Sequence, residues 1–235
     1  MQNDFTKKWE DVVKRRGNTI VAGIDIQDLE EGIDKLGWVK KYVSELRGHI
    51  AGFKINPTFM VGEPQQYEIE KYVAEVCKEE NIVAIYDRKF PEVPNTNIKG
   101  IPGAKKMGYD AVTISQMDGE ASKTIDLCFN EVGIAVFSIG LMSNDGFAEE
   151  VFDNVNLKTG EKLAYSRLSK IIQAGATGIV LGATYDARHK YFLEYKDYVL
   201  KSKKGNFIYL SPGIGAQGTT VEGHIKITNE LGVDP

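Results

Sequence analysis

Two lysines and one aspartate end neighbouring apolar segments, and these residue types suit proton transfer at a reacting carbon. Asp87 and Lys89 close the segment IVAIYDRK, and Lys54 lies near the end of the preceding segment, IAGFKIN. Residues two apart in an extended strand point to the same side, so we expect Asp87 and Lys89 to face the same space. Alternating charges fix each other's protonation states and can hold a lysine charged in a dry site. A structural network of ion pairs would use the same residues.

A glycine-rich turn, SPGIGAQG, follows the last apolar segment and could bind an anion. Its glycines, Gly213, Gly215 and Gly218, allow close approach to the backbone. Successive N–H groups in such a turn can form a nest for a phosphate. An ordinary loop between a strand and a helix would have a similar composition. Its place after the seventh apolar segment favours the phosphate, because barrel enzymes often bind phosphate after strands seven and eight.

Other kinds of catalytic site lack their residues in this sequence. The three histidines, His49, His189 and His224, include no pair at metal-ligand spacing. No G-x-S-x-G elbow, P-loop or strand-coupled G-x-G-x-x-G motif occurs. Cys77 and Cys128 form no C-x-x-C pair, and since Cys77 falls within a helical pattern, we expect it to be a buried free thiol, which fits a reducing cytosol. These patterns therefore give no sign of a metal site, a nucleophile elbow or a nucleotide-binding loop.

The composition is that of an ordinary globular protein, with 42% hydrophobic and 26% charged residues and a net charge of −4. The tightest basic cluster, Lys201, Lys203 and Lys204, stands where a helix should end, which favours a solvated helix end over a nucleic-acid patch. Residues 1–16 lack the apolar core of a signal peptide, and no apolar run is long enough to span a membrane. We expect a cytoplasmic protein that binds neither nucleic acid nor membrane.

Short apolar segments alternate with helical patterns along the whole chain. Nearly continuous, β-branched segments are typical of parallel strands buried on both faces. The expected strands are residues 19–25, 50–56, 82–87, 111–115, 133–139, 178–181 and 207–210. The expected helices are residues 31–47, 65–80, 97–107, 120–130, 165–174, 189–200 and 221–231.

This alternation fits either a doubly wound sheet or a closed barrel. Because no linker or change of composition divides the chain, we expect a single α/β domain over residues 1–235, a (β/α)8 TIM barrel. The eighth strand is missing from this sequence, which stops at Pro235 where that strand would begin. We expect that the eighth strand lies in a C-terminal tail that follows Pro235. Active-site residues of this fold gather at the carboxyl ends of the strands.

Five motifs, in order from residue 25 to residue 218, together resemble the archaeal type of the orotidine 5'-phosphate decarboxylase family. YDRKFPEVPNT, from Tyr86 to Thr96, is similar to the family signature D-x-K-x-x-D-I-P-x-T. Asp25 in GIDIQD and Lys54 in GFKIN resemble the acid and the lysine of the first two strands. Ser143 in LMSNDG and Gln217 in SPGIGAQG resemble the loop serine and the phosphate-loop glutamine.

The resemblance implies a carboxy-lyase that converts orotidine 5'-phosphate to UMP in de novo pyrimidine biosynthesis, without a cofactor. Asp87 would lie against the substrate carboxylate. Lys89 would stabilise the developing carbanion at C6 and then protonate that carbon. Lys54 would orient Asp87 and contact the ribose, and Asp25 would lie near the ribose hydroxyls.

The resemblance also implies how the rest of the substrate is held. Ser143 would bind the pyrimidine, and Gln217 would link the base to the phosphate. The phosphate loop, which includes Pro212, Gly213 and Gly218, would close over the ligand, so that phosphate binding helps to lower the barrier at C6.

In this family a homodimer completes each site, which assigns Glu92 and Thr96 to the site of the neighbouring subunit. Glu92 departs from the family pattern, which has Asp at this place. The longer side chain moves the charge by about one methylene, and a misplacement near 1 Å can cost roughly a hundredfold in rate. The phosphate-binding arginine of the family would follow the eighth strand, beyond Pro235.

Two alternatives remain open at this point. Metal-dependent sugar-phosphate decarboxylases and aldolases of the same suprafamily carry a glutamate metal ligand on the second strand, where this chain has Lys54. A non-catalytic UMP-binding barrel would account for Glu92 and for the early end of the chain.

Overall fold

The computed structural model describes residues 4–116, 119–141, 154–182, 194, 207–214 and 220–231. Seven strands form one sheet in chain order, with parallel pairing of β1 with β2, β2 with β3, β3 with β4, β5 with β6 and β6 with β7. They are β1 Val21–Ile24, β2 Gly52–Ile55, β3 Val83–Phe90, β4 Ala111–Ile114, β5 Ala135–Leu141, β6 Gly178–Leu181 and β7 Ile208–Leu210. This curled parallel sheet confirms the predicted TIM-barrel type, and within the described residues the barrel is incomplete.

Helices alternate with these strands, as the sequence predicts. They are α1 Asp4–Arg16, α2 Lys35–Leu46, α3 Gln66–Glu79, α4 Pro94–Met107, α5 Ala121–Leu127, α7 Leu163–Gln173 and α9 Val221–Leu231. Three shorter helical turns are η1 Ile26–Asp28, η2 Pro57–Met60 and η3 Cys128–Val132. None of the described helices is long and apolar enough to cross a membrane. Of the helix expected at 189–200, only residue 194 lies among the described residues.

Several boundaries differ from the predicted ones for local reasons. α2 begins at Lys35 rather than at residue 31, because Asp34 caps it by accepting a hydrogen bond of 3.1 Å from the Gly37 N–H. α4 begins at Pro94, where a proline suits the first turn, since the N–H it lacks would have no partner within the helix. β3 continues to Phe90, three residues beyond the predicted strand end at residue 87.

The chain divides into two compact units, which are described separately. The first contains Met1–Ile114 and Leu127–Val136, and the second contains Ser115–Asp126 and Phe137–Pro235. The single domain over residues 1–235 stays a prediction.

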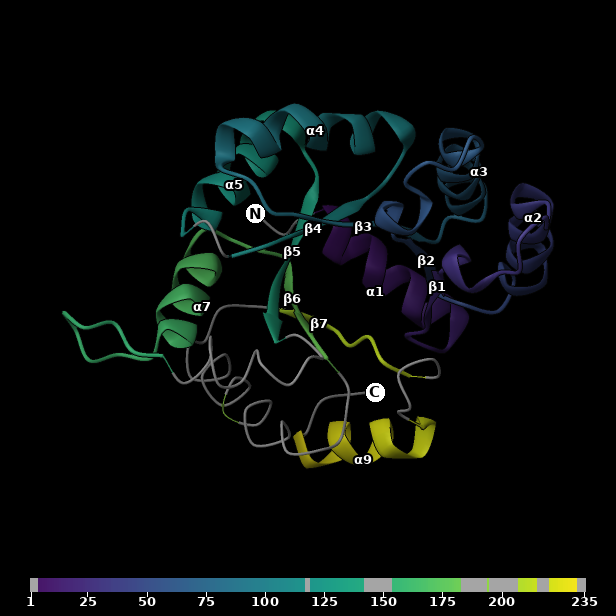
Figure 1. The fold of residues 1–235 in the computed structure, drawn as a ribbon. Helices are drawn as coiled ribbons and strands as arrows, with labels where there is room; N and C mark the ends of the chain where they lie inside the picture. The colour runs from purple at the N-terminus through teal and green to yellow at the C-terminus, as the bar shows by residue number, and fades with distance from the viewer. Residues whose placement is uncertain are drawn as a thin grey trace. The chain divides into compact units, whose positions relative to one another are not determined.

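In the first unit, α3 packs against β2 and β3 and also contacts α2 and α4. Figure 1 shows α2, α3 and α4 on the outer side of these strands. Side chains on both faces of the strands are buried, among them Phe53, Ile55, Ile85 and Val112. Burial on both faces is what nearly continuous apolar strands of a parallel sheet require.

Helix α1, which the sequence patterns did not predict, anchors the amino ends of the strands. Its Lys8 Nζ lies 2.7 Å from Asp110 Oδ2, and that oxygen also accepts a hydrogen bond of 2.9 Å from the Ala84 N–H. Arg16 Nη1 donates a hydrogen bond of 2.6 Å to the Gly48 carbonyl just after α2. These contacts hold the ends of β3 and β4 that lie opposite the predicted site.

In the second unit, β6 lies between β5 and β7, and α7 buries Leu168, Ile171 and Ile172. Gly178 of β6 is required by close packing, because a Cβ atom there would lie 2.1 Å from the Ile208 carbonyl oxygen. Gln116 Nε2 donates a hydrogen bond of 2.7 Å to the Ile139 carbonyl at the end of β5.

Candidate active site

The register of the first three strands brings Lys54 and Asp87 to one face of the sheet. Lys54 pairs with Gly23 of β1 and with Ile85 of β3. Paired residues of parallel strands point to the same side, and Asp87 follows Ile85 by two residues. The result is a hydrogen bond of 2.9 Å from Lys54 Nζ to Asp87 Oδ2.

Lys89 completes the group from the same strand as Asp87. Its Nζ lies 2.9 Å from the same Oδ2 atom of Asp87. The exposed fractions of the side chains are 14% for Lys54, 9% for Asp87 and 47% for Lys89. The carboxylate is therefore buried between two ammonium groups, and Lys89 is the one that remains open to solvent.

Lys89 reaches Asp87 through a break in the strand and not through regular alternation. Tyr86 pairs with Val112, but Phe90 pairs with Ile114, so β3 has two more residues than β4 over this stretch. Lys89 adopts a φ of 51°, which is uncommon for a residue with a side chain. This β-bulge re-aims the lysine, a use of bulges that is frequent next to active sites.

Thr113, which the sequence analysis missed, joins the two residues of the bulge. Its Oγ1 accepts a hydrogen bond of 2.8 Å from the Lys89 N–H and donates one of 2.8 Å to Asp87 Oδ1. The segment AVTIS resembles any buried strand, so no signal in the sequence distinguishes this threonine.

The two lysines keep Asp87 ionised. Burial alone would raise the pKa of this carboxyl, but the charges and hydrogen bonds of Lys54 and Lys89 outweigh burial and hold the pKa below its ordinary value of 3.8. At neutral pH the cluster therefore carries a buried negative charge and two positive ones.

Asp25 follows β1 directly, and its carboxylate folds back over the strand. A Cβ atom on Gly23 would lie 3.3 Å from Asp25 Oδ2. Gly23 is the register partner of Lys54 in the adjacent strand β2, so the Asp25 carboxylate lies beside the partner of Lys54. The absence of a side chain at Gly23 leaves room for this arrangement.

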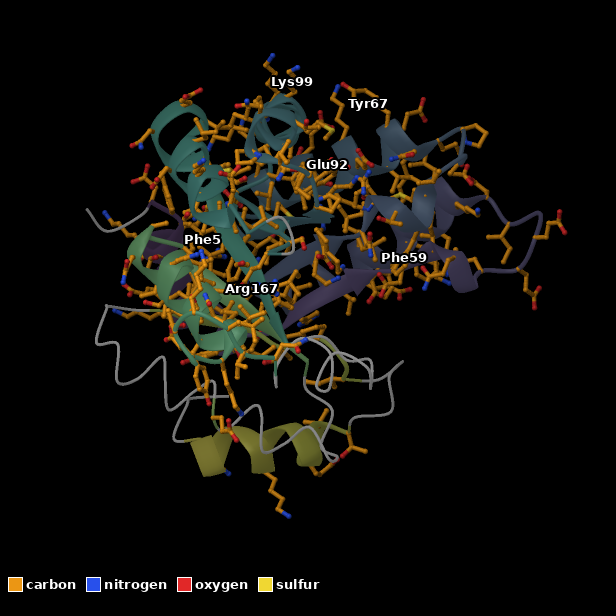
Figure 2. The ribbon with its side chains drawn as sticks, turned by 60° about the vertical axis from the view of Figure 1, so that its left-hand side comes forward. Phe5, Phe59, Tyr67, Glu92, Lys99 and Arg167 are labelled. Atoms are coloured by element: carbon orange, nitrogen blue, oxygen red, sulfur yellow. The ribbon has the colours of Figure 1, made fainter. Side chains whose placement is uncertain are left out.

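Glu92 lies on the surface where the chain passes from β3 into α4, Thr96 is exposed in the first turn of α4, and Figure 2 labels Glu92. The buried Asn97 clasps this turn: its Oδ1 accepts a hydrogen bond of 3.1 Å from the Glu92 N–H, and its Nδ2 donates one of 2.5 Å to the Glu92 carbonyl. Within the described part of the chain, the Glu92 carboxylate has no hydrogen-bond or ion-pair partner. The turn is thus fixed while both side chains remain available.

The predicted substrate-binding residues of the second unit are only partly described. Ser143, Gln217 and Gly218 lie outside the described residues. Pro212 and Gly213 follow β7, and Gly213 adopts a φ of 125°, which favours glycine. Phosphate binding by this loop stays a prediction.

The described residues include two cysteines and no candidate metal site. Cys77 is a buried free thiol, as predicted, and Cys128 is one as well; burial raises the pKa of each to about 12. Such thiols are poor nucleophiles. Among the described residues, no group of three or more His, Cys, Asp or Glu side chains could hold a metal ion.

Comparison with known structures identifies the fold. A crystal structure of a putative orotidine 5'-phosphate decarboxylase from Streptomyces avermitilis has a TM-score of 0.74 and 21% identity, and covers 96% of this chain and 82% of that one. UMP synthase from Leishmania donovani has a TM-score of 0.76 and 18% identity over 96% of this chain. This chain spans 48% of that synthase, about half of its length.

Comparison of sequences identifies the family. The orotidine 5'-phosphate decarboxylase of Listeria monocytogenes is 25% identical over 220 residues, which cover 89% of this chain and 83% of that protein. The sequence model of one family matches residues 18–234, nearly the whole chain. The match extends over a parallel β/α sheet in which β2 and β3 bring Lys54 and Lys89 to Asp87, and the chain belongs to the Orotidine 5'-phosphate decarboxylase / HUMPS family.

Proposed function

We propose that this protein decarboxylates orotidine 5'-phosphate to UMP, in de novo pyrimidine biosynthesis, without a cofactor. The observation that carries the proposal is the buried Asp87 carboxylate, whose Oδ2 accepts hydrogen bonds of 2.9 Å from both Lys54 and Lys89. Membership of the family supports the reaction type, and the charge pattern supports the metal-free version of it.

The proposed chemistry takes place at C6 of the pyrimidine. The bond from C6 to the carboxylate breaks, CO2 leaves, and the electron pair remains on C6. Asp87 lies against the departing carboxylate, and the ammonium group of Lys89 stabilises the carbanion by its charge. Lys89 then gives a proton to C6, which yields UMP, and regains a proton from solvent. The half-exposed side chain of Lys89 suits this exchange.

Lys54 and Asp25 serve the ribose in this proposal. Lys54 is the more buried of the two lysines, and its contact with Asp87 fixes the direction of the carboxylate. Asp25 lies at the end of the neighbouring strand, within reach of the same face. A cation and an anion side by side match the hydroxyl groups of a ribose, which both donate and accept hydrogen bonds.

The remaining binding groups come from the loops that follow β5 and β7. We propose that Ser143 binds the base, that Gln217 links base and phosphate, and that the turn from Pro212 to Gly218 binds the phosphate. The φ of 125° at Gly213 supports a turn built for backbone contacts. Phosphate binding, remote from C6, would drive closure of the loop.

We further propose a cytoplasmic homodimer whose sites are shared, with Glu92 and Thr96 entering the site of the partner. Both side chains are exposed, although Asn97 fixes the turn that carries them. Large apolar side chains of the same unit are also exposed, and an interface between two copies would cover them. They are Phe59, Val61, Tyr67 and Val93, of which Figure 2 labels Phe59 and Tyr67.

A metal-dependent sugar-phosphate lyase remains the second possibility for this family. Such an enzyme would bind a divalent cation through the acid at the end of β3. Here the ammonium groups of Lys54 and Lys89 lie within 2.9 Å of that acid and would repel a cation. The charge pattern therefore favours the decarboxylase.

The proposal is tested by following the absorbance of orotidine 5'-phosphate in the presence of excess EDTA. Loss of the absorbance, with UMP as the product, supports the proposed function. Turnover that requires added Mg²⁺ would assign the protein to the metal-dependent lyases. Binding of UMP without any turnover would assign it as a nucleotide-binding barrel.

A further inference from the structure

The hydroxyl group of Thr113 connects the two reacting residues of the bulge, the Asp87 carboxylate and the Lys89 backbone. We propose that Thr113 is a positioning residue for decarboxylation, which sets the place of both Asp87 and Lys89 without touching the substrate. The proposal rests on the proposed function, because it concerns the rate of that reaction.

The two carboxylate oxygens of Asp87 have different hydrogen-bond partners. A threonine hydroxyl has one proton to donate and lone pairs to accept. It donates that proton to Asp87 Oδ1 and accepts from the Lys89 N–H, both at 2.8 Å. Oδ2 is then left to bind the two lysine ammonium groups at 2.9 Å each. The carboxylate is thereby held against rotation about its last bond.

The Thr113 hydroxyl oxygen also accepts a hydrogen bond, and it thereby gives a partner to a backbone N–H group of the bulge. Between its pairs with β4, the stretch from Tyr86 to Phe90 has two extra residues, so the Lys89 N–H does not follow the regular ladder. An N–H group that is shielded from water and lacks a partner destabilises the fold. Thr113 Oγ1 supplies that partner, and it supports Lys89 in its left-handed conformation, with φ 51°.

Burial makes Thr113 a rigid support. The side chain is fully buried, and so are its neighbours in β4, Val112 and Ile114. A β-branched side chain in a strand also has few rotamers. The hydroxyl therefore stays in place, and it transmits the position of β4 to the reacting groups of β3.

Removal of the hydroxyl should impair chemistry more than binding. Asp87 Oδ1 and the Lys89 N–H would lose their shared partner, and both groups would shift to find others. A misplacement of about 1 Å can cost roughly a hundredfold in rate. The groups proposed to bind phosphate and base lie on other loops, so KM should change little.

The test compares Thr113→Val, which keeps the shape and removes the hydroxyl, with Thr113→Ser, which keeps the hydroxyl. We expect kcat to fall roughly 30- to 100-fold for Thr113→Val with KM within about threefold, and Thr113→Ser to restore most of kcat. Thr124→Val is the matched control, because Thr124 is equally buried but its hydroxyl has no partner among the described residues. If Thr113→Val does not fold, kcat is compared between Thr113→Ala and Thr113→Ser, which differ only by the hydroxyl oxygen.

A second measurement does not depend on turnover. The carboxyl carbon of Asp87 is titrated by ¹³C NMR in the wild type and in Thr113→Val, and is assigned with Asp87→Asn. Loss of a donor to the charged form should raise the titration midpoint of Asp87 in the variant.

The two measurements separate the two proposals. Wild-type turnover with an unchanged kcat in Thr113→Val would overturn the role of Thr113 alone. Absence of wild-type turnover would overturn the proposed function, and the titration would then decide whether Thr113 holds Asp87. An unchanged midpoint would overturn that role as well, and a raised midpoint would support it.

Discussion

Lys54 Nζ lies 2.9 Å from Asp87 Oδ2, and the two residues come from adjacent parallel strands, β2 and β3. The pairing of Lys54 with Ile85, two residues before Asp87, makes this contact a consequence of strand register. The same oxygen of Asp87 also binds Lys89 Nζ. One carboxylate oxygen with two cations is a charge pattern that can face a negatively charged substrate and still supply a proton.

Replacement of Lys89 by alanine should abolish decarboxylation and leave a folded protein. We expect kcat to fall by at least about a thousandfold, because a positioned general acid contributes roughly 10²–10⁴ and Lys89 also stabilises the carbanion. The side chain is 47% exposed, and Lys54 still pairs with Asp87, so the circular dichroism spectrum should not change. Steady-state kinetics and the spectrum check both parts.

The matched control for this variant is Lys105→Ala, which removes an exposed lysine of α4. It should keep the wild-type kcat. Wild-type activity in Lys89→Ala would refute the role assigned to Lys89.

Replacement of Lys54 by methionine should destabilise the fold and make it more sensitive to acid. Asp87 would lose the better-buried of its two charged partners, which should cost about 1.5–3 kcal/mol in the free energy of unfolding. The lysines lower the pKa of Asp87, so its contribution is present above 3.8 and is lost as pH falls through the folded-state pKa. With Lys54 gone, that pKa rises and the loss begins at a higher pH.

Urea unfolding of Lys54→Met between pH 3 and pH 7 measures this effect. Lys41→Met, at an exposed position of α2, is the control and should unfold like the wild type. Equal stability of Lys54→Met and wild type at every pH would show that the contact contributes nothing to the fold.

Glu70 should give the opposite pH dependence. Burial raises its pKa above 4.5, although Gln66 Nε2 and the Tyr86 hydroxyl donate hydrogen bonds to it at 2.7 Å and 3.3 Å. The folded state therefore binds this proton more tightly than the unfolded chain does. Its contribution to stability is present below 4.5 and is lost as pH rises through the folded-state pKa.

Unfolding of Glu70→Gln, which is neutral at every pH, isolates this contribution. The wild type should lose stability relative to this variant as pH rises from 4 to 7. Glu79→Gln, at an exposed position of the same helix, should show no such trend. A pH-independent difference between Glu70→Gln and wild type would mean that Glu70 titrates normally.

Shared sites predict complementation between two inactive variants. Glu92→Ala and Lys89→Ala, mixed and reassociated, should form mixed dimers in which one site has both residues. Random pairing gives one intact site in half of the dimers, so about a quarter of wild-type activity should return. The recovered activity is measured after dilution from mild denaturant. No recovery from a mixture that has formed mixed dimers would show that Glu92 acts within its own subunit.

The sequence predicts the strands well because buried parallel strands have a simple signature. The expected strand at 178–181 and the expected helix at 221–231 agree with β6 and α9 in their bounds. The convergence of Lys54 and Asp87 also follows from strand ends that share one edge of the sheet. These are local patterns combined with one general rule of the fold.

The details of the site could not be predicted, because they depend on contacts between strands. The Lys89 N–H in the bulge requires a partner in β4, and only the hydrogen bond in the folded chain shows that this partner is Thr113. Asn97 looks like an ordinary helical residue until its two hydrogen bonds to Glu92 are seen. The sequence patterns do not predict helix α1, because it is rich in charged residues and buries few side chains.

The most direct test of the proposed metal-free reaction is to incubate the protein with orotidine 5'-phosphate in D2O that contains EDTA, and to examine the product by NMR. The account predicts UMP with one deuterium at C6, because the solvent-exchangeable ammonium group of Lys89 delivers the proton to that carbon. Recovery of unchanged orotidine 5'-phosphate, or formation of UMP only after Mg²⁺ is added, would contradict the account.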